Sequence, residues 1–284
     1  MPDELPDHAN ADQTAYWNAS AGETWAALQD RLDRQIDPLG RRAIAALSPL
    51  VGEAVLDVGC GCGQTSLELA GWVGGSGRVL GLDVSRPMLT VARQRAAPAE
   101  AVQPEFIEGD AQTYAFKPGS FDAAFSRFGV MFFSEPSVAF ANIRSALRGG
   151  GRLAFVCWRG LADNDWMRIP LAAGLQHLAA PPAPDPFAPG PFAFSDPARV
   201  TAILSEASFE DIVIEAHDQK IGAGDLDETV ATALKVGPLG ALLRETPEHR
   251  DAIVATLGDT LRPYLTPQGV MMNSATWIVR AHSR

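Results

Sequence analysis

The sequence contains very few cysteines, and their spacing does not resemble that of a structural metal site. Only Cys60, Cys62 and Cys157 occur among 284 residues. An odd cysteine count without an export signal argues against a disulfide framework and favours a reducing compartment such as the cytoplasm. Cys60 and Cys62 stand two positions apart, with no second pair and no nearby histidine, which disfavours a zinc site. We therefore expect neither disulfides nor a bound metal.

Long apolar runs and basic clusters are also missing. No stretch reaches the roughly 18 uninterrupted apolar residues of a membrane span, and the N-terminal stretch MPDELPDHANADQ lacks the apolar core of a secretory signal. Lys and Arg total 23 against 34 Asp and Glu, a formal net charge of -11. Such a chain repels nucleic-acid phosphates and anionic lipid headgroups. The composition predicts a cytoplasmic protein that binds neither nucleic acid nor membrane, and it leaves the oligomeric state open.

The middle of the chain alternates between two kinds of pattern. Short β-rich runs begin at Ala54, and helical segments separate them. The runs are AVLDV, RVLGLDV, EFIEGD, FDAAFS and GRLAFVCW, and the helical segments are QTSLELAGWV, RPMLTVARQRA and EPSVAFANIRSALR. This alternation predicts right-handed βαβ units, a mostly parallel sheet and a doubly wound α/β fold.

The flanking segments depart from this alternation. We expect a flexible start followed by a helix over 25–47, which Pro38 breaks or kinks. Ser85 and Asp196 are expected to cap the helices that follow them. Residues 159–195 include the proline-rich segment PPAPDPFAPGPFAF, which predicts an ordered, extended cover. Further along, we predict a helix over 196–208, a strand over 209–217, two helices within 224–263 and an edge-region strand over 274–282.

One glycine-rich turn carries the strongest functional signal. In AVLDVGCGCGQ a buried strand ends at Asp57, and Gly59, Gly61 and Gly63 follow at alternate positions. Glycine permits positive φ and lets a ligand approach the backbone closely. The turn, which includes Cys60, opens a helix whose free N–H groups suit a carboxylate or another polar ligand.

Two acidic residues follow later strands and strengthen this signal. Asp83 ends the run RVLGLDV, where an acid can accept hydrogen bonds from a ribose diol. Asp110 ends a third strand in FIEGDAQ and can accept a proton from the exocyclic amine of adenine. The carboxyl ends of parallel strands meet at one edge of a sheet, so these residues predict a nucleoside site.

The fourth strand supplies the continuation of the same crevice. Ser126 and Arg127 stand at its end, and the apolar residues after them either line a pocket or belong to the core. Those residues are Phe128, Met131, Phe132 and Phe133.

The pattern Asp57-x-Gly59-x-Gly61-x-Gly63, with Asp83 and Asp110 behind it, resembles class I S-adenosylmethionine (SAM)-dependent methyltransferases. The segment YWNASAGETWAALQDRLDRQIDPLG also resembles the bacterial group related to ubiquinone and menaquinone C-methylases. The resemblance implies that the glycine loop faces the methionine part of SAM, Asp83 the ribose and Asp110 the adenine amine. Val84, Met88 and Ala111 would then lie against the adenine, and Tyr16, Trp17 and Trp25 would close over the cofactor.

The resemblance further implies a seven-stranded sheet of order 3-2-1-4-5-7-6, with the last strand antiparallel and a helical cap over the strand ends. We expect an N-terminal helical segment (1–50), a SAM-binding core (51–158), cap insertions (159–195 and 218–272) and segments that complete the core (196–217 and 273–284). Trp158, Trp166, Met131, Phe132 and Phe128 are candidates for an acceptor pocket.

The chemistry needs few protein groups. Methyl transfer from a sulfonium mainly requires alignment, and a general base is needed only if the acceptor must lose a proton. Among five histidines we single out His177, which stands in the cap region near Trp166, and leave a packing role open. The sequence predicts a small-molecule acceptor and does not identify it.

Three alternatives stay open on sequence alone. One is a SAM-binding protein with regulatory or non-methyl chemistry. Another is an NAD(P)-dependent oxidoreductase, although Gly59, Gly61 and Gly63 do not give the G-x-G-x-x-G spacing. The third is a nucleic-acid methyltransferase, which the acidity and the sequence SRFG after the fourth strand disfavour.

Overall fold

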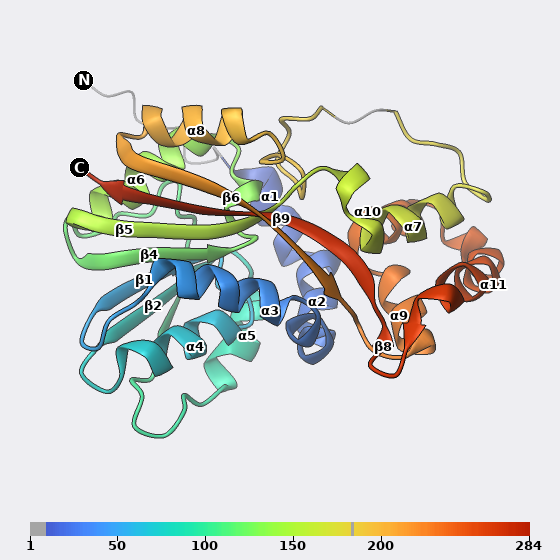
Figure 1. The fold of residues 1–284 in the computed structure, drawn as a ribbon, viewed down its shortest axis with the longest axis horizontal. Helices are drawn as coiled ribbons and strands as arrows, with labels where there is room; N and C mark the ends of the chain where they lie inside the picture. The colour runs from blue at the N-terminus through green and yellow to red at the C-terminus, as the bar shows by residue number, and fades with distance from the viewer. Residues whose placement is uncertain (1–9, 183–184) are drawn as a thin grey trace.

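The computed structural model describes residues 10–182 and 185–284. His8 and most of the acidic N-terminal stretch, where we expect a flexible start without a signal, lie outside the described residues. A seven-stranded sheet forms the centre of the molecule, in the order β3-β2-β1-β4-β5-β9-β6 (Figure 1). Its strands are β1 (Ala54–Val58), β2 (Arg78–Asp83), β3 (Glu105–Glu108), β4 (Phe121–Arg127), β5 (Leu147–Trp158), β6 (Phe209–Ile221) and β9 (Met272–Ser283).

This order confirms the predicted topology. The first five strands pair in parallel, whereas β9 runs antiparallel to both β5 and β6. Four of the five residues of β1 are buried, as expected for a central strand that is covered on both faces. The predicted edge-region strand is β9, which lies second from the edge and pairs with β6, the strand that forms that edge.

Helices cover both faces of the sheet. Figure 1 shows α3 (Gln29–Leu47), α4 (Gln64–Val73) and α5 (Arg86–Gln94) on one face, with α6 (Pro136–Ala146) and α8 (Pro197–Glu206) on the other. Helix α4 turns Leu69, Ala70 and Val73 into the core, the apolar stripe that a covering helix needs. Asp196 caps α8 as predicted, since its side chain accepts a hydrogen bond from the N–H of Ala198.

Several local predictions were wrong. The helix predicted over 25–47 is divided at Leu28, where α2 (Ser20–Ala27) ends and α3 begins. The break expected at Pro38 is absent, because Ile36, Leu39 and Ala43 pack into the core on both sides of it. Ser85 precedes α5, but its hydroxyl donates to the carbonyl oxygen of Trp17 instead of capping the helix. The local proline rule and the local capping rule each yield here to a tertiary contact.

The cap contains one helix more than predicted. Residues 224–263 form α9 (Leu226–Ala233), α10 (Gly237–Glu245) and α11 (Arg250–Leu261), because prolines at 238 and 247 each start a new helical segment. These helices pack with α7 (Asp165–Gly174) around a second hydrophobic cluster, separate from the core of the sheet. A short hairpin of β7 (Leu265–Thr266) and β8 (Gly269–Val270) leads back into β9.

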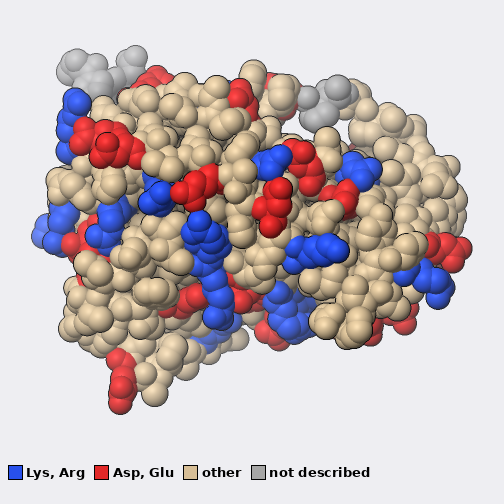
Figure 2. All heavy atoms as spheres, viewed as in Figure 1, with Lys and Arg blue, Asp and Glu red and all other residues tan. Residues whose placement is uncertain are grey.

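The N-terminal helices α1 (Ala11–Asn18) and α2 (Ser20–Ala27) lie between the sheet and the cap (Figure 1). Acidic and basic side chains are interspersed over the face in Figure 2, and no broad basic patch interrupts them there. Within residues 10–182 and 185–284, no helix has both the length and the apolar character to cross a membrane.

Candidate active site

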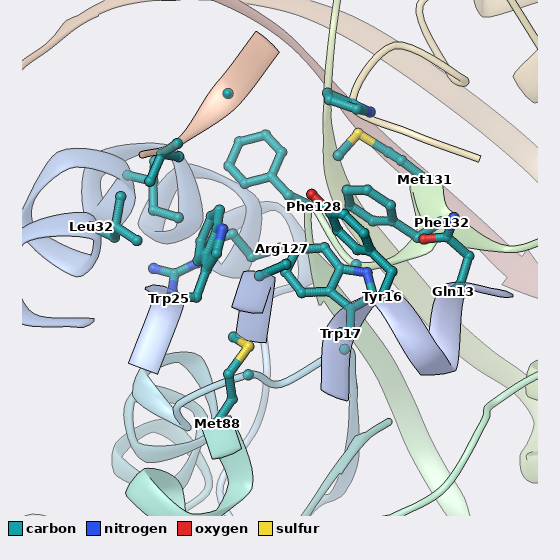
Figure 3. Close-up of a pocket in the computed structure, with 18 of the residues that line it drawn as sticks. Gln13, Tyr16, Trp17, Trp25, Leu32, Met88, Arg127, Phe128, Met131 and Phe132 are labelled. Atoms are coloured by element: carbon teal, nitrogen blue, oxygen red, sulfur yellow. The ribbon is translucent and has the colours of Figure 1, made fainter. Parts of the chain in front are cut away.

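A cavity of about 540 Å³ opens where the carboxyl ends of β1, β2 and β4 face the N-terminal helices and the cap. Its floor is the loop between β1 and α4, and its walls come from α1, α2, α3, α7 and α10. Figure 3 shows Trp17, Phe128 and Phe132 gathered in its middle, with Met88 reaching toward them from α5. Doubly wound folds bind ligands at this edge of the sheet.

The loop after β1 has the geometry that its glycines predict. Gly59, Gly61 and Gly63 adopt φ of 68°, 54° and 80°. A Cβ on Gly59 would stand 2.8 Å from the Cα of Gly129, so the loop and the end of β4 approach as closely as two backbones can. The N–H of Gly59 bonds to the carbonyl oxygen of Leu82 at 2.8 Å, which fixes the loop against β2.

Asp57 supports this loop from beneath and does not line the cavity. Its Oδ2 accepts hydrogen bonds from the hydroxyls of Thr65 (2.7 Å) and Ser66 (2.6 Å). Its Oδ1 is buried without a partner among the described residues. Burial raises the pKa of Asp57 to about 6, although the two hydroxyls oppose that shift. Asp57 thus joins the strand to the first turn of α4.

Two more of the predicted cofactor residues lie behind the cavity wall. Gly63 precedes α4 and packs toward the ring of Phe106. The hydroxyl of Ser126 accepts a hydrogen bond from the N–H of Gly129 at 3.2 Å. Neither residue lines the cavity, and both fix the backbone that does.

Asp83 lines the cavity and joins two parts of its floor. Its Oδ2 accepts the N–H of Gly61 at 2.7 Å, and its Oδ1 accepts the N–H of Ser85 at 2.8 Å. Burial raises the pKa of Asp83, and these backbone hydrogen bonds oppose the shift. The N–H of Val84 also bonds to this carboxylate, and since a carboxylate has about four lone-pair positions, one remains for a ribose hydroxyl.

The third acid lies at the far end of the same floor. Oδ1 of Asp110 accepts the N–H of Gln112 at 2.9 Å, and the Asn10 side chain also bonds to this carboxylate. Burial raises the pKa of Asp110. Asn10 and Asp110 both line the cavity, and Oδ1 of Asn10 is buried without a partner among the described residues. Two oxygen acceptors here suit an amino group. The cavity lining also includes the predicted residues Val84, Met88, Ala111 and Cys60.

Aromatic side chains form the upper walls. The rings of Phe128 and Trp158 stack with centroids 4.0 Å apart and planes at 9°, and Trp166 leans on Trp158 at 5.1 Å. Trp17 meets Phe132 edge-on at 5.1 Å. All the predicted acceptor residues line the cavity: Phe128, Met131, Phe132, Trp158 and Trp166. Phe128 adopts φ of 60°, a strained conformation for a bulky residue and one that often marks a functional site.

His177 lies away from this cavity. Its Nε2 is 2.7 Å from the hydroxyl of Thr256 on α11, and it does not belong to the cavity lining. This position favours the packing role over that of a general base.

An ion network joins α3 to the loop, and sequence reasoning missed most of it. Asp33 lies between Arg127 (3.1 Å) and Arg95 (3.0 Å), and Arg95 also donates to the carbonyl oxygen of Cys62 at 3.0 Å. Arg127 further bonds to the side-chain oxygen of Gln64. Arg127 could be expected here from its place at the end of β4. Asp33 and Arg95 could not, because they come from α3 and from the end of α5.

The loop cysteines are protonated thiols. Cys60 and Cys62 are buried and free, as is Cys157. Burial raises the pKa of the Cys60 thiol well above its usual range and that of Cys62 to about 12. Neither thiol is a ready nucleophile or metal ligand at neutral pH.

Known proteins share this sequence pattern and this fold. Residues 55–151 match the family model described as a methyltransferase domain. Aklanonic acid methyltransferase DauC of Streptomyces sp. (strain C5) is 36% identical over 42% of this chain and 54% of its own length. The demethylmenaquinone methyltransferase of Lactococcus lactis subsp. lactis is 30% identical over 43% of this chain and 49% of its own. The chain thus spans about half the length of these two relatives.

A weaker similarity extends over more of the chain. Nocamycin O-methyltransferase of Saccharothrix syringae is 27% identical over 78% of this chain and 81% of its own length. The crystal structure of the YcgJ protein from Bacillus subtilis superposes with a TM-score of 0.56, at 17% identity, over 86% of this chain and 99% of that one. Residues 55–151 therefore match a methyltransferase domain, and the sheet order agrees with the fold of the superposed structure.

Proposed function

We propose that this protein binds SAM and transfers its methyl group to a small organic acceptor. The observation that carries the proposal is the position of Asp83, whose carboxylate holds the glycine loop and still faces the cavity. Relatives named for small-molecule methylation, such as the aklanonic acid and nocamycin enzymes, support it.

The cavity floor fits such a cofactor in three places. The loop at Gly59 and Gly61 presents backbone to the cavity with no side chain in the way. Asp83 has one acceptor position left for a ribose hydroxyl, and the buried oxygen of Asn10 beside Asp110 suits the adenine amine. The bound cofactor supplies an activated methyl group on a sulfonium.

The residues of this chain then contribute position and the exclusion of water. The aromatic walls replace water with apolar ring surface over part of the cavity. The Asp33–Arg127 contact is well buried, with side-chain exposures of 14% and 11%, and keeps α3 against the end of β4. Alignment of this kind contributes on the order of 7–11 kcal/mol to a two-reactant step. We further propose that residues 51–158 bind the donor and that 159–195 and 218–272 select the acceptor.

Calorimetric titration tests the proposal directly. SAM and its demethylated product S-adenosylhomocysteine should bind, and NADH should not. We expect Asp83→Asn to weaken SAM binding by about tenfold or more, because the ribose loses a charged hydrogen-bond acceptor. A hydrogen bond to a charged group contributes about 1.5–3 kcal/mol, and 1.4 kcal/mol corresponds to a factor of ten. Asp110→Asn should weaken it less, since Asn10 keeps an oxygen at that end.

A matched control removes a carboxylate elsewhere. Asp218 is exposed on β6, where it pairs with Arg159, and Asp218→Asn should leave binding unchanged. Circular dichroism of each variant shows whether it folds. Absence of SAM binding to the folded wild type, or binding of NADH in its place, would overturn the proposal.

A further inference from the structure

Charges are unevenly distributed around the cavity. The acidic residues of its lining are Asp33, Asp83 and Asp110. Asp83 ends β2 and Asp110 follows β3, whereas Asp33 is paired with two arginines. Arg244 of α10 and Lys235, just before the N-cap of that helix, also belong to the cavity lining, and both are partly open to solvent. Among the described residues, neither cation has a carboxylate within ion-pair distance.

The contacts of Arg244 leave its charge uncompensated. Its Nη1 donates to the carbonyl oxygen of Lys235 at 3.3 Å, and its Nη2 donates to the Tyr16 hydroxyl at 3.1 Å. Both partners are neutral. A guanidinium has five N–H donors, so three remain for an anion. The guanidinium also lies over the Tyr16 ring, 5.9 Å from its centroid, which holds the cation beside the cavity without neutralising it.

The cavity also lacks a free general base. Its described lining residues include no histidine and no glutamate. Asp33 is paired with arginines, Asp83 already holds three backbone N–H groups, and the loop thiols are protonated. An acceptor with a neutral hydroxyl would need a base nearby. An aliphatic amine is cationic near neutral pH and would be repelled by Lys235 and Arg244, whereas an aromatic amine is neutral and would gain nothing from them.

The walls favour a flat molecule. The stacked pair of Phe128 and Trp158 and the edge-on pair of Trp17 and Phe132 present ring surfaces to the middle of the cavity. Aromatic walls of this kind hold planar apolar ligands. Polar groups with a free charge are concentrated toward α10.

We propose that the acceptor is a planar aromatic acid that enters as its anion and is recognised by Arg244 and Lys235. This inference rests on the proposed methyl transfer. The anion forms a bond to the methyl carbon while the carbon–sulfur bond breaks and its electron pair stays on sulfur. No proton needs to be removed, and the product is neutral. The two cations therefore hold the acceptor and no longer hold the methylated product.

Two probes of nearly the same shape, one an anion and the other neutral, test this recognition. 2-Naphthoate and 2-naphthamide are titrated into the wild-type protein loaded with S-adenosylhomocysteine, so that no turnover occurs. We expect naphthoate to bind at least about tenfold more tightly, as charge-assisted hydrogen bonds of about 1.5–3 kcal/mol imply. Arg244→Gln should abolish most of that preference, and Arg244→Lys should keep part of it.

The matched control is Arg250→Gln. Arg250 is exposed at the start of α11, lies outside the cavity lining, and has no ion pair among the described residues. The substitution Arg250→Gln changes the charge of the cap by the same amount as Arg244→Gln and should preserve the preference for naphthoate. S-adenosylhomocysteine binding is measured first for every variant.

The outcomes separate this inference from the proposed function. If the wild type does not bind S-adenosylhomocysteine, the proposed function fails and this inference with it. If it binds, but the two probes bind equally or not at all, only the inference is overturned. It is also overturned if Arg244→Gln weakens S-adenosylhomocysteine as much as naphthoate, since the cation would then belong to the donor site.

Discussion

The floor and the roof of the cavity are built from the chain in different ways. The floor comes from residues that directly follow β1, β2 and β3, and its polar groups are fixed by backbone hydrogen bonds. The roof comes from α1, α7 and α10, whose contacts join residues as far apart in sequence as Tyr16 and Arg244. A rigid floor suits a constant ligand, and a roof assembled from separate segments suits a ligand that differs between relatives.

The sharpest way to break the floor is to substitute Gly59. Gly59→Ala places a Cβ 2.8 Å from the Cα of Gly129 and forces a non-glycine residue to φ of 68°. We expect a loss of about 4 kcal/mol in unfolding free energy, measured by urea denaturation, because a left-handed conformation and a backbone clash both contribute. Gly119→Ala is the control: its φ is 62° but nothing lies within 4 Å, so about 1 kcal/mol should be lost.

Cavity-forming substitutions compare the two hydrophobic clusters. Leu257 lies in the cap cluster and Leu56 in β1, and both are fully buried. Each change to alanine should cost about 3 kcal/mol of stability. Only Leu56→Ala should also weaken S-adenosylhomocysteine binding, because β1 carries the loop. Equal weakening by Leu257→Ala would show that the roof takes part in holding the donor.

The buried acid beneath the floor predicts a pH dependence. The pKa of Asp57 is about 6 in the folded protein against an ordinary value of 3.8. The folded state therefore holds this proton more tightly than the unfolded state does. The resulting stability is fully present below pH 4 and is lost as pH rises through about 6, by at most about 3 kcal/mol.

Asp57→Asn removes this titration. The unfolding free energy of the wild type, minus that of the variant, should decrease as the pH is raised from 4 to 7. Urea denaturation at a series of pH values measures this difference. Asp259→Asn, at an exposed position on α11, is the control and should give a difference that is flat with pH. A flat difference for Asp57→Asn as well would contradict the burial argument.

The smallest expected effect concerns the contact between α3, which forms one wall of the cavity, and α9 of the cap. Arg31 of α3 bonds to the Glu228 carboxylate and to the Thr232 hydroxyl of α9, each at 3.2 Å. Because the pair is partly exposed, Arg31→Ala should cost less than about 1 kcal/mol. Amide hydrogen exchange in α9 should nevertheless become faster. Arg42→Ala, which breaks a similar pair with Glu215 on β6, should leave α9 unchanged.

The sequence could predict the floor because its signals are local. A buried strand, a glycine turn and an acid at the next strand end lie within about thirty residues of one another, and parallel strands bring their ends together. The same logic placed Asp83 and Asp110 correctly at the cavity. It could not tell that Asp57 and Ser126 face away from the cavity, because side-chain direction at a strand end depends on the helix packed against it.

The roof could be predicted only as a list of aromatic residues. Nothing near Tyr16 in the sequence indicates Arg244, and nothing near Asp33 indicates Arg127. His177 was singled out from its neighbours Trp166 and Met167, but its side chain bonds to Thr256 on a helix almost eighty residues later. Such pairings depend on how the cap helices pack, which periodicity does not encode.

The strands β6 and β9 add a consequence of a different kind. Ile221 pairs with Met272, so the whole segment between them leaves and re-enters the sheet through one pair of adjacent residues. The length of this segment can therefore change without altering the strand order. Its helices also pack on α7, which precedes β6 in the chain. We therefore expect changes in the segment to be accompanied by compensating changes in α7.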